Sequence, residues 1–412
     1  MERHLGGLER QFHQQNLIGS THMCGTLRFQ GIFDEERLRQ AVKAISIAYP
    51  LLRTSVVADP YLRFSLQDAL PEIPVAFIDR EDDEHWRRVV EKELIRQFKP
   101  GEGLAYFHVL RGKDAFDIIF TVNHCVVDGL TAGLVCRNLL LSYNGEAIKP
   151  EALQTSMEAR FPRIFRGVIG WLLTLRFIWS LIRLGPSLQV GTADLTYNTL
   201  SQGFTFHKPK ELNRLARERG SNLFAVISAV ILQSVYELYG KSEVEPVSLN
   251  TPVSLRPGIG ASVDEFGVFL AGHIAVYKVQ KNTDTWALAK ECYETLNKGL
   301  KKGNPFLLAK LASGPRKPRI VEVKPNISDR RPTINISNMG RVEPFPLMGT
   351  AAVTEHRAAA AQSVRDPFAF TLVSYQGRMF IDLQSSEEKL GRDQSLTLIR
   401  TVEKNLDRLL QP

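Results

Sequence analysis

The sequence contains little cysteine, with four such residues among 412. Cys24, Cys125, Cys136 and Cys292 lie far apart in the chain. They have neither the spacing of metal ligands nor the density of a disulfide framework. We therefore expect reduced thiols and no metal site.

The sequence also lacks a long uncharged apolar run, even in its most apolar segment, residues 164–184. The longest uncharged run of this segment, Gly167 to Leu175, has nine residues. A bilayer-spanning helix needs about 20 apolar residues, so no transmembrane helix is expected. The first residues, Met1 to Gly7, lack the apolar core of a signal peptide. The expected location is the cytoplasm.

The basic residues form no cluster that would indicate a nucleic-acid binder. The net charge is +8 and the pI is near 9.3, which favours acidic partners. However, no Lys/Arg-rich run is interleaved with aromatic residues, so we expect no nucleic-acid partner. A phosphorylated cofactor, an acidic carrier protein or an anionic membrane surface would each suit the positive charge.

The overall composition is that of a globular protein, with 44% apolar and 23% charged residues. Because 412 residues exceed what one hydrophobic core holds, we expect two domains of about 200 residues each. The predicted domains are 1–185 and 190–412, and 144–190 contains the connection between them together with an apolar helix.

Strand and helix patterns alternate in both halves, which indicates an α/β fold. Periodicity predicts strands at 23–30, 51–57, 104–110, 116–122, 246–255, 266–279, 333–337, 368–375 and 378–384. It predicts helices at 34–49, 85–98, 130–141, 164–184, 208–219, 221–240, 284–300 and 394–410. Ser221 is the expected N-cap of its helix. Residues 301–332 are rich in Lys, Arg and Pro and are predicted to be a loop.

The apolar segment 164–184 has two interpretations. In the first it is a helix that packs on a domain or between the two domains. In the second it is an interfacial helix in the headgroup region of a membrane, with Trp171, Trp179 and Phe residues on one side and Arg on the other. The Arg176/Ser180/Arg183 stripe is interrupted by Phe177, so the separation of the two faces is imperfect.

The segment from Phe116 to Gly129 carries the candidate chemistry. Residues 116–122 alternate like a mostly buried strand that presents His124 at its carboxyl end. With Asp128 and Gly129, this histidine forms an H-x-x-x-D-G pattern where the strand leads into a helix. A neutral histidine suits removal of a proton from a hydroxyl or amine that attacks a carbonyl. The structural alternative is a helix-capping Asp beside a core histidine.

No nucleophile motif such as G-x-S-x-G is present, so a covalent acyl-enzyme is not expected. Cys125 follows His124 directly, and neighbours along a strand point to opposite faces. We therefore assign Cys125 to the core.

The sequence resembles the chloramphenicol-acetyltransferase-like acyltransferases, a family that includes condensation domains of peptide synthetases, plant acyl-CoA-dependent acyltransferases and polyketide-associated acyltransferases. His-Cys-Val-Val-Asp-Gly at 124–129 carries the resemblance. Weaker matches occur in the family's order over most of the chain: Leu5–Arg10 at its opening, Tyr49–Thr54 at its "hpxLR" segment, Thr251–Pro257 at "vnLRp" and Ile336–Arg341 at "SNLGrv".

This resemblance implies two domains of similar topology that face each other across a central channel. His124 would lie at the middle of the channel and would deprotonate the acceptor, which then attacks an acyl thioester. The donor would be an acyl-CoA or an acyl carrier protein, in either case a phosphopantetheine thioester. No bound cofactor, metal or covalent intermediate is implied.

The resemblance also implies roles for other residues of the site. In the family the aspartate matching Asp128 points away from the substrate and pairs with an arginine, for which Arg256 is the candidate. These two residues and Gly129 would be structural. Ser337 and Asn338 are candidates for hydrogen bonds to the oxyanion or the substrate, although such a sequence also suits a strand-ending turn.

The Asp-Phe-Gly-Trp-Gly box of the plant members is absent, and Asp264–Phe269 shares only a fragment of it. No adenylation or carrier domain accompanies the sequence. The nearest relatives are therefore expected to be stand-alone polyketide-associated or alcohol acyltransferases. The first hypothesis is acyl transfer from a thioester to a hydroxyl of a lipid-like or secondary-metabolite acceptor, with peripheral membrane contact through 164–184. The alternatives are amide formation on an amine, and a non-catalytic module that binds a carrier protein or a membrane.

Overall fold

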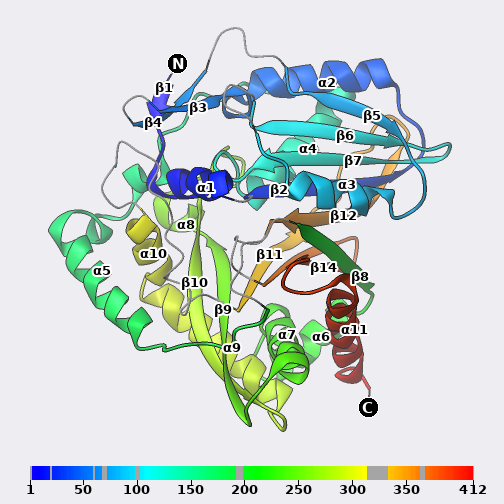
Figure 1. The fold of residues 1–412 in the computed structure, drawn as a ribbon. Coiled ribbons are helices and arrows are strands. Elements are labelled where there is room, and N and C mark those ends of the chain that lie inside the picture. Colours follow the sequence, from blue (N-terminus) through cyan, green and yellow to red (C-terminus); the bar gives the residue numbers. More distant parts are fainter. Residues whose placement is uncertain are drawn as a thin grey trace.

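The chain folds around two mixed β-sheets with helices packed on them (Figure 1). The computed structural model describes residues 2–18, 21–58, 61–66, 72–98, 103–191, 198–312, 333–361 and 367–411. The fold is mixed α/β, as the sequence predicts.

The first sheet has five strands in the order β12-β2-β7-β6-β5. Its strands are β2 (His22–Gln30), β5 (Val75–Asp79), β6 (Ala105–Arg111), β7 (Ala115–Asn123) and β12 (Ala352–Ala360). The strands predicted at 104–110 and 116–122 form the antiparallel hairpin β6–β7. Central strand β7 is buried on both faces, because helices cover each side of the sheet.

Alternation along β7 divides its side chains between two packing layers. Phe116, Ile118 and Phe120 pack in one hydrophobic cluster with helices α2 (Glu35–Ala48) and α4 (Gly129–Tyr143). Ile119 packs in another cluster with α3 (His85–Leu94). These two layers hold the carboxyl end of β7, where His124 follows, inside the molecule.

The second sheet has six strands in the order β10-β9-β11-β13-β14-β8. They are β8 (Thr199–Phe206), β9 (Val244–Ser254), β10 (Leu270–Gln280), β11 (Ile334–Val342), β13 (Phe368–Tyr375) and β14 (Arg378–Ser386). The strands predicted at 368–375 and 378–384 form the hairpin β13–β14, and Gln376 at its turn has a positive φ of 48°.

Four helices accompany the second sheet: α6 (Pro209–Glu218), α7 (Leu223–Tyr239), α9 (Thr285–Lys301) and α11 (Arg392–Arg408). Helix α7 is buried nearly all round and joins the sheet, α9 and α11 in one core. The predicted N-cap of α7 is wrong. Asn222 caps the helix by accepting from Ala225 N, while the Ser221 hydroxyl donates to the Ala289 carbonyl of α9.

The remaining elements surround the junction of the two sheets. A small sheet in the order β1-β4-β3 lies near the N-terminus (Figure 1). Its strands are β1 (Glu2–His4), β3 (Ser55–Ala58) and β4 (Leu62–Ser65). The other helices are α1 (Gly7–Ile18), α5 (Gly167–Ile182), α8 (Arg256–Ile259) and α10 (Asn304–Ala312). Short 3-10 turns occupy Pro50–Arg53, Met157–Arg160 and Arg163–Phe165.

Several predicted boundaries differ from the structure. The strand predicted at 51–57 begins only at Ser55, because Pro50 starts a 3-10 turn. The predicted loop at 301–332 contains helix α10, which is stabilised by packing on α5 and β10 rather than by periodicity; residues 313–332 of that prediction lie outside the described residues. The strand predicted at 266–279 begins at Leu270.

Strand β12 crosses from the C-terminal half of the chain into the first sheet, where it pairs with β2. The first sheet therefore contains a strand from the predicted domain 190–412. The division of the chain into two domains near residue 190 stays a prediction.

A buried ionic network joins the two sheets. Asp382 of β14 lies 3.1 Å from Arg357 Nη1 of β12 and 3.4 Å from Arg87 Nη1 of α3. All three side chains are almost completely buried. Each arginine also contacts a second carboxylate, Glu355 or Glu84. The network thus fixes β14 of the second sheet against two elements of the first.

No single described helix is long and apolar enough to cross a membrane. Among the described helices, the pair α6 and α7 together meets the criteria of length and composition, and these two helices are bent by 95° where they join.

Candidate active site

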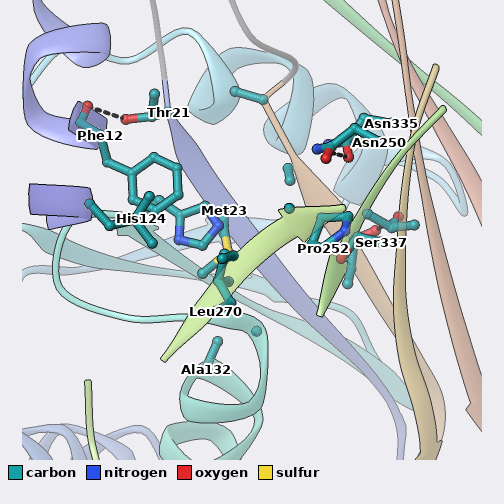
Figure 2. A pocket seen from close by; sticks show the side chains of 18 of the residues that line it. Phe12, Thr21, Met23, His124, Ala132, Asn250, Pro252, Leu270, Asn335 and Ser337 are labelled. Carbon is teal, nitrogen blue, oxygen red and sulfur yellow. Dashed lines mark hydrogen bonds between the residues drawn. The ribbon is translucent and has the colours of Figure 1, made fainter. Parts of the chain in front are cut away.

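His124 follows the last residue of β7 and lies at a cavity between the two sheets (Figure 2). The cavity has a volume of about 600 Å³ and is enclosed by both halves of the chain. Its walls come from α1, β2 and α4 on one side and from β9, β10, α10 and β11 on the other. Most lining side chains are apolar or small, such as Met23, Ala132, Pro252 and Leu270.

Two contacts fix the imidazole of His124. Its Nδ1 lies 2.8 Å from the carbonyl oxygen of Val127. The ring is stacked on Phe12 of α1, with centroids 4.2 Å apart and an interplanar angle of 11°. Because a carbonyl only accepts hydrogen bonds, Nδ1 carries the proton in the neutral ring. Nε2 then keeps its lone pair, and no described residue forms a hydrogen bond with it.

The surroundings favour the neutral form of His124. Burial lowers the pKa of the imidazole below its ordinary value of 6.5, although the Val127 carbonyl and the charge of Asp128 partly offset this effect. A neutral imidazole at neutral pH is able to accept a proton. His124 is therefore suited to general-base chemistry.

Asp128 points away from the cavity into a buried ion pair. Its Oδ2 accepts a hydrogen bond from Arg256 Nη1 at 2.5 Å, and its Oδ1 lies 3.2 Å from Arg256 Nη2. Both side chains are about 2% exposed. Asp128 also caps α4 by accepting from Thr131 N. The structure thus brings together Asp128 and Arg256, as the resemblance implies.

Backbone groups of the loop before β10 complete the surroundings of Asp128. Phe269 N donates to Asp128 Oδ2 at 3.0 Å, and Asp128 N donates to the Gly267 carbonyl at 3.1 Å. The Thr131 hydroxyl lies 2.8 Å from the same carbonyl and accepts from Arg256 Nη2. With these partners the carboxylate is fully hydrogen-bonded, so it has no free position from which to act on a substrate.

In the sequence, the loop at 264–269 shares only a fragment of the Asp-Phe-Gly-Trp-Gly box of the plant family members. The structure places it directly against Asp128, and Phe266 stacks on Tyr49 at a centroid distance of 4.7 Å. No local signal in the sequence indicates this contact, because the loop and Asp128 are separated by more than a hundred residues.

Gly129 lines the cavity at the first turn of α4. A Cβ atom at this position would lie 2.5 Å from the end of the Met339 side chain of β11. Glycine therefore allows the two halves to approach closely beside His124.

The structure separates Ser337 from Asn338. Ser337 lines the cavity, whereas Asn338 is exposed and its Oδ1 accepts from Gly340 N in a strand irregularity. Successive side chains of a strand point to opposite faces, so only one of the two can face the substrate. Figure 2 shows Ser337 and His124 on different sides of the cavity, which makes Ser337 a candidate contact for a more distant part of the substrate.

Other polar residues of the cavity were not identified from the sequence. Asn250 Nδ2 donates to Asn335 Oδ1 at 3.1 Å near Ser337 (Figure 2). His356 of β12 also lines the cavity, and burial lowers its pKa to about 4. These residues lie on strands with no distinctive motif, and the packing of the two sheets brings them together at the cavity.

The four cysteines are free and buried, and burial raises their pKa values. The residues that the structure describes contain no group of three or more His, Cys, Asp or Glu side chains placed to hold a metal ion.

Comparison with known proteins gives consistent matches. Residues 200–384 match the family described as phthiocerol/phthiodiolone dimycocerosyl transferase C-terminus. Surfactin synthase subunit 1 of Bacillus subtilis is 24% identical over 271 residues, and tyrocidine synthase 3 of Brevibacillus parabrevis is 25% identical over 269 residues. Each match covers 60% of this chain but only 7% and 4% of the respective relatives, so the chain spans a small part of their length.

Solved structures share the fold over nearly the whole chain. Polyketide synthase associated protein 5 from Mycobacterium tuberculosis has a TM-score of 0.68 at 18% identity, with 98% of this chain and 97% of that chain covered. The first condensation domain of the calcium-dependent antibiotic synthetase, in complex with a substrate analogue, has a TM-score of 0.78 at 15% identity, with 99% and 96% covered. The chain therefore has the fold of these proteins, and its residues 200–384 are similar to the phthiocerol/phthiodiolone dimycocerosyl transferase C-terminal family.

Proposed function

We propose that this protein transfers an acyl group from a phosphopantetheine thioester, carried by CoA or by a carrier protein, to a hydroxyl of a lipid-like or secondary-metabolite acceptor. The observation that supports this most is the orientation of His124. Its Nδ1–H is committed to Val127 O, which leaves the Nε2 lone pair of this residue able to accept a proton at the cavity.

In the proposed reaction, His124 Nε2 removes the acceptor's proton as its oxygen attacks the thioester carbonyl. The tetrahedral intermediate collapses with cleavage of the C–S bond, and the thiolate leaves with the proton that His124 has accepted. The ester and the free thiol are the products. No enzyme-bound acyl group forms, because the cysteines are buried and their pKa values are raised.

The cavity lining supports a largely apolar substrate. Apolar and small side chains from both halves surround His124, and polar groups such as Asn250, Asn335 and Ser337 lie apart from it (Figure 2). Pockets of this kind bind apolar ligands and use their few polar groups to orient them. The net charge of +8 favours an anionic donor such as a CoA or an acidic carrier protein.

Amide formation is the second candidate, because several structural relatives are condensation domains. His124 would serve an amine acceptor in the same way. A non-catalytic module that binds a carrier protein or a membrane is the third possibility.

A panel of acyl-CoA and carrier-bound donors, offered with alcohol and amine acceptors of matched chain length, tests the proposal. Thiol release is followed with a thiol reagent, and the products are identified by mass spectrometry. We expect thiol release that depends on the alcohol and yields an ester. Faster turnover with the amine would favour condensation, and no thiol release from any donor would contradict an enzymatic role.

A further inference from the structure

Helix α5 packs on the rest of the molecule through one narrow face. Gly170, Thr174 and Phe177 are its buried residues. Just before the helix, Phe165 stacks on Phe306 of α10 with centroids 4.9 Å apart, and Lys310 Nζ donates to the Phe165 carbonyl at 2.8 Å. These contacts hold α5 along the outside of α10, at the edge of the molecule (Figure 1).

The opposite face of α5 is apolar and exposed. Val168, Leu172, Leu175 and Trp179 follow one another at spacings of four, three and four residues, which places them on one stripe. Their side chains are 76%, 61%, 52% and 65% exposed. A continuous apolar stripe of this kind is unusual on a soluble monomer and marks a surface that binds something.

Positive charge surrounds this stripe. Arg163, Arg166, Arg176 and Arg183 are all exposed, and residues 159–191 contain neither Asp nor Glu. Arg176 and Arg183 lie four residues after Leu172 and Trp179, so they flank the stripe along one side. Exposed Lys301 and Lys302 precede Gly303, where an added Cβ atom would meet the Phe165 ring.

The combination of charge and apolar surface favours one occupant. A second copy of this chain would place its own residues 159–191, which carry only positive charges, against this surface, and like charges across an interface oppose association. An anionic bilayer surface instead takes Leu and Trp side chains at the boundary between headgroups and acyl chains, and its phosphates attract the arginines.

We propose that α5 lies flat in the surface of an anionic phospholipid bilayer, with Val168, Leu172, Leu175 and Trp179 inserted and the flanking arginines at the headgroups. The helix has 16 residues and is therefore about 24 Å long, which is too short to span a bilayer. Trp171, which is 45% exposed, lies beside the stripe, three residues after Val168 and four before Leu175. It would also lie at the membrane interface, where Trp side chains are favoured.

This placement brings the membrane close to the cavity. Helix α10 contacts α5, with Lys310 Nζ 5.4 Å from the centroid of the Trp171 ring. Residues Leu308, Ala309, Leu311 and Ala312 of α10 line the cavity that contains His124. One helix therefore separates the proposed membrane surface from the site. The membrane contact rests on α5 alone and does not depend on the proposed reaction, but it would suit an acceptor that resides in a bilayer.

Vesicle sedimentation tests the proposal directly. Full-length protein is mixed with vesicles of three parts phosphatidylcholine to one part phosphatidylglycerol, or of phosphatidylcholine alone. We expect stronger binding to the anionic vesicles, weakened by salt. Leu172→Glu/Trp179→Glu should lower binding at least about tenfold, because it removes two inserted apolar side chains. Arg176→Gln/Arg183→Gln should reduce the preference for anionic vesicles.

Ile47→Glu provides a matched control, because Ile47 is an exposed apolar residue (53%) on α2, far from α5 in Figure 1. This variant should bind as the wild type does. Thiol release with a short, water-soluble thioester and alcohol should be unchanged in the α5 variants, so that a failed reaction and a failed membrane contact give different results. The proposal is overturned if the wild type ignores both vesicles, if Leu172→Glu/Trp179→Glu binds equally well, or if light scattering shows a dimer that this variant dissociates.

Discussion

At the scale of single residues, the site separates a proton acceptor from a structural carboxylate. His124 presents Nε2 at the cavity because Val127 O occupies Nδ1 and Phe12 holds the ring from one side. Asp128 lies only four residues away, but its oxygens are occupied by Arg256, Thr131 and the backbone of Phe269. The H-x-x-x-D-G pattern thus contains one candidate base, His124, and one structural residue, Asp128, whose hydrogen bonds connect α4 to the second half of the chain.

Asp128→Asn tests this division of roles. The amide keeps the shape of the side chain but leaves the Arg256 guanidinium buried without its carboxylate, which costs about 3–5 kcal/mol. We expect a corresponding fall in the free energy of unfolding, measured by urea denaturation. The acid limb of the activity profile should stay in place or move to lower pH, because the charge of Asp128 raises the pKa of His124. Unchanged stability together with an acid limb displaced to higher pH would instead make Asp128 a proton-transfer residue.

The pH dependence of the reaction should follow His124. Its folded-state pKa is lowered below 6.5, and the base works only when neutral. Activity should therefore be complete near pH 7 and should be lost as the pH falls through this lowered pKa. A profile of kcat/KM against pH, with a substrate that does not titrate in this range, should show its acid limb below 6.5. An acid limb above 6.5 would contradict the burial argument.

At the scale of elements, the two sheets are joined by a strand and by charges. Strand β12 comes from the C-terminal half and pairs with β2 of the first sheet. Its Arg357, with Arg87 of α3, meets Asp382 of β14 in the second sheet. Since the cavity lies between the sheets, these contacts fix the distance between its walls.

Asp382→Asn should weaken this junction. Each arginine keeps a second carboxylate partner, Glu355 or Glu84. We therefore expect the free energy of unfolding to fall by about 3 kcal/mol, near the lower end of the range for a broken buried ion pair. The midpoint of urea unfolding should fall accordingly. Asp393→Asn, an exposed position in the first turn of α11, serves as the control and should change the midpoint little. Equal midpoints for both variants would show that the network does not hold the halves together.

At the scale of the whole molecule, the strongly periodic parts of the fold could be predicted from the sequence. The alternation in β7, the apolar spacing of α9 and α11, and the β13–β14 hairpin all carry local signals. Helix α10 and strand β12 could not be predicted, because neither has a distinctive period and each is stabilised by distant partners.

The residues of the candidate site also fall into those that the sequence identifies and those that only the folded structure brings together. His124, Asp128 and Gly129 are adjacent in the sequence, so their motif identifies them, and the resemblance supplied Arg256. By contrast, the Phe12 stack, the Asn250–Asn335 pair and the backbone of Gly267 and Phe269 reach the site only through folding. The sequence motif did not distinguish Ser337 from Asn338, whereas the alternation of side chains along the strand places only Ser337 at the cavity.

The central claim is that His124 is the base of a transfer reaction inside the cavity. Thiol release by His124→Gln, compared with the wild type and with the exposed control His207→Gln, tests it most directly. The account predicts that His124→Gln loses about 10²–10⁴-fold in kcat, with an unfolding midpoint close to that of the wild type, while His207→Gln stays fully active. Full activity in a folded His124→Gln protein would contradict it.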